Sequence, residues 1–84
     1  MDDSAELRRT IMDTINKVRT DSGRDAVDGK DGDLLTGELG LDSLDLAVLV
    51  VSLEKELGVD PFRDGSATAR TLQDLVTVYF EAES

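Results

Sequence analysis

The chain has no cysteine, no histidine and no tryptophan among its 84 residues. Without cysteine it can form no disulfide and no thiolate metal site, and it lacks a sulfur nucleophile of its own. Without histidine it can form no Ser-His-Asp arrangement, and the commonest general base at neutral pH is missing. We therefore expect no catalytic residue and no enzyme activity.

Long apolar runs and a basic amino terminus are missing as well. No apolar run approaches the ~18 residues of a membrane span, and the start MDDSAELRR lacks the regions of a signal peptide. The 19 acidic and 9 basic residues give a net charge of -10, which repels nucleic acid and anionic membranes. We expect a cytoplasmic monomer without membrane insertion, whose partners present basic surfaces unless the acidity serves only solubility.

The apolar residues that remain predict helices. Apolar side chains recur at helical spacing over residues 3–18, 43–57 and 71–83, and Gly58 is a good terminator for the middle helix. A chain this short forms one domain, residues 1–84, with a core too thin for a deep substrate cavity. The first helix should bury Leu7, Ile11, Ile15 and Val18, and the last should bury Leu72, Leu75, Val76 and Tyr79.

The segments between these helices differ in character. Residues 21–42 contain five glycines and no sustained period, which predicts a long loop. Residues 59–70 could hold a short helical turn around Ser66–Arg70. The predicted fold is therefore all-α, a small four-helix bundle of three main helices and a short third one. The anchors of the long loop should be Leu34, Leu35, Leu39 and Leu41.

The helix predicted over residues 43–57 is apolar on two opposite faces. Because a small bundle turns one face of each helix to its core, the second face has no obvious intramolecular partner. Exposing it costs about 25 cal/mol per Å². The core face holds Leu46, Leu49, Val50, Leu53 and Leu57; the second face holds Leu44, Ala47, Val48 and Val51, with Asp42, Asp45 and Glu54 at its rim.

An apolar centre with a charged rim is typical of a surface that recognises another protein. In the alternative interpretation, the short helical turn or the long loop covers Val48 and Val51 and makes them ordinary core.

Ser43 stands at the first position of this helix. Asp42 suits the N-cap position, and Asp45 three residues later resembles a weaker capping box. The unpaired N–H groups and the helix dipole favour negative charge there, such as a phosphodiester, although Asp42 and Asp45 partly offset this. On these grounds alone, a serine at a helix start is usually a simple cap.

The stretch LGLDSLDLAVLVVSLEKELGV, residues 39–59, resembles the signature of the acyl carrier protein family. The G-x-D-S-L core of that signature matches Gly40, Asp42, Ser43 and Leu44. The resemblance extends more loosely to the whole chain, from the first helix and long loop to the short third and final helices.

This resemblance implies that Ser43 receives 4'-phosphopantetheine from coenzyme A through a phosphopantetheinyl transferase. The arm would supply the thiol that the chain lacks, and acyl groups would travel on it as thioesters to enzymes of fatty-acid, polyketide or related biosynthesis. The family's partner-contacting positions match Asp42, Leu44, Ala47, Val51 and Glu54, to which the second face adds Asp45 and Val48.

Two positions depart from the family pattern. Val48 stands where many fatty-acid carriers have a glutamate, and Lys55 replaces a frequent acidic residue. These two departures favour a carrier with a dedicated pathway partner over a generic fatty-acid carrier.

Three other interpretations stay open at this point. A plain interaction domain would use the second face alone, and a peptidyl carrier would load amino acids. A calcium loop is suggested by DAVDGKDGD, but its spacing fails the EF-hand pattern, so we assign no metal ligand. Loose divalent binding could still involve Asp25, Asp28, Asp31 and Asp33.

Overall fold

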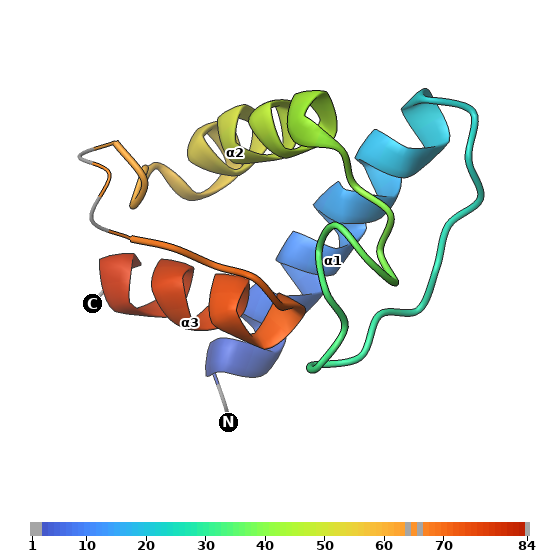
Figure 1. The fold of residues 1–84 in the computed structure, drawn as a ribbon. Helices are drawn as coiled ribbons and strands as arrows, with labels where there is room; N and C mark the ends of the chain where they lie inside the picture. Colours follow the sequence, from blue (N-terminus) through green and yellow to red (C-terminus); the bar gives the residue numbers. More distant parts are fainter. Residues whose placement is uncertain (1–2, 64, 66, 84) are drawn as a thin grey trace.

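The computed structural model describes residues 3–63, 65 and 67–83. These residues form three helices and no named strand: α1 (Asp3–Asp21), α2 (Ser43–Leu57) and α3 (Leu72–Glu83). Figure 1 shows α1 running obliquely past both α2 and α3, and it packs against each of them. The predicted all-α class is confirmed for this part of the chain. None of its helices is both long enough and apolar enough to cross a membrane.

The bounds of α2 agree with the prediction because both of its ends carry strong local signals. At the start, Asp42 and Asp45 form a capping box, in which each side chain accepts a hydrogen bond from the backbone N–H of the other. At the end, Gly58 adopts a left-handed conformation with φ 75°, and its N–H donates to the Glu54 carbonyl at 2.8 Å.

The other two helices lie close to their predicted positions. The α1 helix continues three residues beyond the predicted Val18, and a turn at Gly23, with φ 84°, follows its end. At the start of α3, the Thr71 hydroxyl accepts from the Asp74 N–H at 3.1 Å. Thr71 is therefore the N-cap that the sequence predicts.

The short third helix is not found in the described residues, so the prediction is wrong for residues 67–70; Ser66 lies outside the described part. Residues 67–70 form neither helix nor turn, and Thr71 forms an isolated antiparallel bridge with Leu34. The Leu35 N–H donates to the Arg70 carbonyl at 2.9 Å, and the Leu72 N–H donates to the Asp33 carbonyl at 3.0 Å. The backbone here bonds to the long loop instead of to a helical turn of its own.

The long loop between α1 and α2 is held by both apolar and polar contacts. Leu35, Leu39 and Leu41 are buried as predicted, whereas Leu34 is 42% exposed, so its predicted role as an anchor is wrong. The Asn16 side chain donates to the Val27 carbonyl at 2.9 Å and accepts from the Val27 N–H at 2.8 Å. The loop therefore has a fixed path along α1.

The core lies where the three helices and the loop leucines meet. All four predicted core residues of α1 and all four of α3 are buried. On α2, Leu49 and Leu53 are buried, while Leu46, Val50 and Leu57 are half-buried. The chain therefore buries one face of each helix, as expected for a bundle of this size.

Tyr79 is fully buried, yet its hydroxyl has no hydrogen-bond partner within the described residues. Its ring meets the ring of Phe62 edge to face, with centroids 5.9 Å apart. Burial, together with the nearby charges of Asp60 and Glu54, raises the pKa of Tyr79 to about 12. An unpaired buried hydroxyl costs about 1–3 kcal/mol of stability.

We predict that Tyr79→Phe raises the free energy of unfolding by about 1 kcal/mol, because it removes the unpaired hydroxyl and keeps the ring. Tyr79→Leu, as the control, should lower it by about 2 kcal/mol through lost ring volume. Urea unfolding at neutral pH measures both. A clear loss of stability in Tyr79→Phe would show that the hydroxyl has a partner.

The raised pKa of Tyr79 should also make the folded protein less stable at alkaline pH. Between pH 10, where an unperturbed tyrosine ionises, and about 12, the folded chain keeps a proton that the unfolded chain has lost. The free energy of unfolding should therefore fall as pH rises through this range, and less steeply in Tyr79→Phe. Because the chain has a single tyrosine, the difference between the two profiles reports this group alone.

Candidate functional site

Ser43 is the first residue of α2 and is exposed to solvent. No hydrogen bond joins its hydroxyl to any other described residue. The preceding residue, Asp42, is extended (φ -93°, ψ -177°), so the chain turns into the helix at Ser43 itself. The Ser43 hydroxyl therefore lies at the electropositive end of a 15-residue helix, accessible to another molecule.

The two carboxylates beside Ser43 are engaged with each other's backbone. The Asp45 N–H donates to Asp42 Oδ1 at 2.8 Å, and the Asp42 N–H donates to Asp45 Oδ2 at 3.1 Å. The Asp42 N–H lowers the pKa of Asp45; burial opposes this shift, and the Arg24 guanidinium adds to it. The Asp45 carboxylate is therefore charged at neutral pH and holds the first turn of α2 in place.

Two arginines from the end of α1 and the following turn reach this helix start. Arg24 Nη2 donates to Asp45 Oδ2 at 2.6 Å, and Arg24 Nη1 donates to the Gly40 carbonyl. Arg19 Nη1 donates to the Leu39 carbonyl at 2.6 Å. The turn at Gly40 has φ 64°, a conformation that favours glycine. Both guanidinium groups therefore fix the turn that leads into Ser43.

Sequence reasoning missed both arginines. Arg24 lies in a segment without periodicity, and its ion-pair partner is 21 residues away. The only available signal was that a basic residue interrupts an acidic, glycine-rich segment. That signal does not say which carboxylate the arginine meets.

The second face of α2 is exposed, as the sequence predicts. Leu44 is 72% exposed, Val51 52% and Val48 46%, and Ala47 is exposed beside them. Neither the long loop nor the segment after α2 makes them part of the core. We call these four residues the apolar face of α2.

The acidic rim expected around this face is only partly present. Asp42 is exposed, and the Glu54 side chain is 43% exposed with an Arg63 nitrogen 3.6 Å away. Asp45 does not lie with them, because it is buried at 8% exposure and turned toward Arg24. Of the three predicted rim residues, the structure therefore brings Asp42 and Glu54 to the surface of α2.

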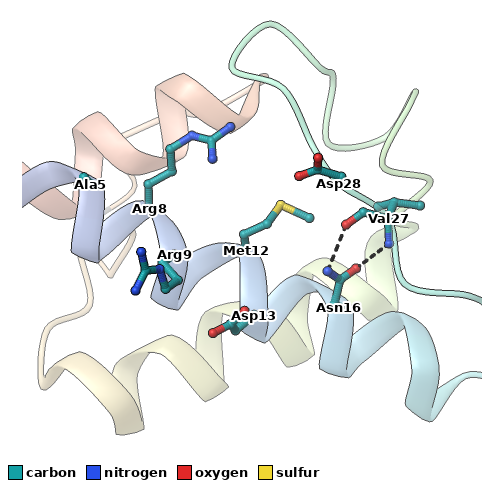
Figure 2. Close-up of a pocket in the computed structure, with 8 residues that line it drawn as sticks. All are labelled: Ala5, Arg8, Arg9, Met12, Asp13, Asn16, Val27 and Asp28. Carbon is teal, nitrogen blue, oxygen red and sulfur yellow. Dashed lines mark hydrogen bonds between the residues drawn. The ribbon is translucent and has the colours of Figure 1, made fainter.

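A separate hollow of about 400 Å³ lies between α1 and the loop at residues 27–28. Figure 2 shows Met12 at its centre, Arg8 and Arg9 to one side, and the paired Asn16 and Val27 to the other. None of its lining residues belongs to α2, so it is not continuous with Ser43. Two of its polar side chains are engaged, since Arg8 bonds to the loop and Asn16 to Val27.

The loop aspartates do not gather around a common point. Among the residues described, no three acidic side chains form a group that could hold a metal ion. Asp31 pairs with Arg8 at 2.8 Å, and Asp33 Oδ2 accepts from the Lys30 N–H at 2.9 Å. These carboxylates stabilise the loop itself.

Comparison with protein-family models matches residues 13–78 to a family described as a phosphopantetheine attachment site. No curated protein and no solved structure matches the chain. The matched range covers well over half of the 84 residues and includes the whole of α2. The chain therefore belongs to the phosphopantetheine-attachment family, whose members hold 4'-phosphopantetheine covalently on a serine.

Proposed function

We propose that Ser43 is the attachment residue and that the protein is an acyl carrier. A phosphopantetheinyl transferase would move 4'-phosphopantetheine from coenzyme A to the Ser43 hydroxyl: the serine oxygen would form a phosphodiester and lose its proton, while the pyrophosphate bond of coenzyme A breaks and adenosine 3',5'-bisphosphate leaves. When bound, this group would supply a thiol on a flexible arm, which carries acyl groups as thioesters. The protein itself would present these groups to partner enzymes without catalysing their conversion.

The observation that carries this proposal is the position of the Ser43 hydroxyl compared with the other serines in the matched range. Ser22 donates its hydroxyl to the Val18 carbonyl at 2.7 Å, and Ser52 is half-buried in the middle of α2. Ser66 lies outside the described residues. Ser43 alone combines exposure, an unengaged hydroxyl and a helix amino terminus within the described part.

The electrostatics of the helix start favour a phosphodiester at this place. A negative group at a helix amino terminus gains about 0.3–1 kcal/mol from the dipole. Arg24 pairs with Asp45 and so reduces the repulsion that this carboxylate would exert on a phosphate at Ser43. Asp42 remains as an exposed charge for a transferase to contact.

We predict that Ser43 alone among the serines accepts one phosphopantetheine group. The purified chain is incubated with coenzyme A, magnesium and a promiscuous transferase, and the intact mass is measured before and after. Ser43→Ala should keep the unmodified mass. Modification of Ser43→Ala, or an unmodified wild-type chain under conditions that load a control carrier, would refute the assignment.

The apolar face of α2 is proposed as the surface that meets the transferase and the acyl-processing enzymes. Its central side chains are apolar and its edge carries Asp42 and Glu54, a layout that fits an apolar patch with basic residues around it. Asp45 is left out of this surface because Arg24 and the capping box already engage it. Val48 and Lys55 make the face less acidic than in many fatty-acid carriers, which favours a dedicated partner enzyme.

We predict that Val51→Asp lowers kcat/KM of the transferase reaction about tenfold while it leaves the thermal midpoint within about 3 °C, because half of this side chain is already in solvent. Thr77→Asp is the matched control, since it adds the same charge at an exposed position on α3. Both variants are compared by loading kinetics and by thermal unfolding. If Val51→Asp loads as fast as Thr77→Asp, Val51 has no role in docking; if it unfolds the protein, the side chain belongs to the core and not to a docking surface.

A further inference from the structure

Arg24 contacts the chain on both sides of Ser43. Three residues before the serine, its Nη1 donates to the Gly40 carbonyl; two residues after it, its Nη2 reaches Asp45 Oδ2 at 2.6 Å. The same oxygen of Asp45 accepts from the Asp42 N–H at 3.1 Å. A single guanidinium therefore joins the turn, the N-cap and the first turn of α2.

These contacts control the part of the chain that places the Ser43 hydroxyl. Asp42 sets the direction in which the backbone enters α2, and among the described residues its N–H donates to the Asp45 carboxylate, which Arg24 also holds. The planar guanidinium presents its N–H donors in a rigid fork that spans both acceptors, whereas the donors of a lysine all lie on one compact ammonium group. Loss of Arg24 would therefore remove two contacts that hold the segment leading into α2, one at Gly40 and one at Asp45.

The contacts are partly buried but lie apart from the core of the bundle. The Arg24 side chain is 32% exposed, while Leu49 and Leu53, which fasten α2 to the rest of the protein, are fully buried one and two turns further along. Removing the guanidinium should therefore loosen the first turn of α2 and leave its packing intact.

We propose that Arg24 is a positioning residue for the modification of Ser43: by clamping Gly40 and Asp45 it holds the serine hydroxyl in the orientation that the transferase needs. This inference rests on the proposed attachment of phosphopantetheine to Ser43. Arg24 donates a hydrogen bond neither to the Ser43 hydroxyl nor to a residue of the proposed docking surface, so it acts through Gly40 and Asp45.

Arg24→Gln tests the inference, and Arg8→Gln is its matched control. Arg8 makes the same kind of clamp, to the Asp31 carboxylate at 2.8 Å and to the Gly29 carbonyl at 2.9 Å, but on a part of the loop that does not border Ser43. Both substitutions remove one positive charge, so the change in net charge of the protein is the same for the two.

We predict that Arg24→Gln lowers kcat for the loading of Ser43 about tenfold and changes KM less than about twofold, because the docking surface is intact and the reacting group is misplaced. Arg8→Gln should load like the wild type. Arg24→Lys keeps the charge but lacks the planar fork that spans both acceptors, and it should load at a rate between those of wild type and Arg24→Gln. Equal rates for Arg24→Gln and Arg8→Gln would overturn the proposal.

Amide hydrogen exchange distinguishes positioning from a general loss of stability. In Arg24→Gln the amides of Asp42 and Asp45 should exchange at least fivefold faster, whereas those of Leu49 and Leu53 keep their wild-type rates. Faster exchange along the whole of α2 would mean that Arg24 acts through the fold, and would also overturn the proposal.

The exchange measurement needs no transferase. If the wild-type chain is not loaded at all, the assignment of Ser43 fails, while the exchange rates still show whether Arg24 holds the start of α2. If the wild-type chain and Arg8→Gln load and Arg24→Gln loads equally well, only the role of Arg24 fails.

Discussion

The start of α2 depends on one carboxylate. Asp45 Oδ2 accepts from both the Asp42 N–H and the Arg24 guanidinium, and the Asp42 side chain in turn accepts from the Asp45 N–H. These bonds satisfy backbone donors that a helix amino terminus otherwise leaves unpaired. They fix the residue at which α2 begins, and this places Ser43 at its tip.

A helix that begins at Ser43 carries its serine and its exposed apolar side chains on the same side. At 3.6 residues per turn, Ser43, Glu54 and the apolar face of α2 fall within a sector of roughly 140°. Leu49 and Leu53 project from the opposite side into the core. The α2 helix therefore carries both the proposed attachment residue and the surface beside it. A partner that binds the apolar face of α2 would have Ser43 at a fixed position and orientation.

Much of this arrangement could be predicted from the sequence because its causes are local. Helical spacing, the Asp42 cap and Gly58 fix the bounds of α2, and the surplus of apolar residues on it indicates an exposed face. The predicted place of Asp45 at the rim is wrong, although its spacing along the helix already argues against it. On a helical wheel Asp45 lies nearer to Leu49 than to Glu54, so it points toward the loop that brings Arg24 to it.

The errors have a common cause in contacts between residues far apart in the chain. The exposed Leu34 and the missing helix at residues 67–70 both follow from the bridge between Leu34 and Thr71. Such a bridge leaves no periodic signal in either segment. Sequence periodicity reports how a segment packs by itself, and it cannot show which distant backbone groups the segment will bond.

The long loop therefore does more than connect two helices. Arg24, near the start of the loop, bonds to the Gly40 carbonyl and to Asp45, and Arg19 bonds to the Leu39 carbonyl. These contacts define the entry to α2. Nearer the middle of the loop, the carbonyls of Asp31 and Asp33 accept from the N–H groups of Gln73 and Leu72, which are donors that the first turn of α3 cannot pair within the helix. Buried leucines fix the loop against α1. The loop therefore positions the starts of both α2 and α3 relative to α1. A glycine-rich segment is suited to this role, because its backbone can approach two helix ends closely and in conformations that other residues avoid.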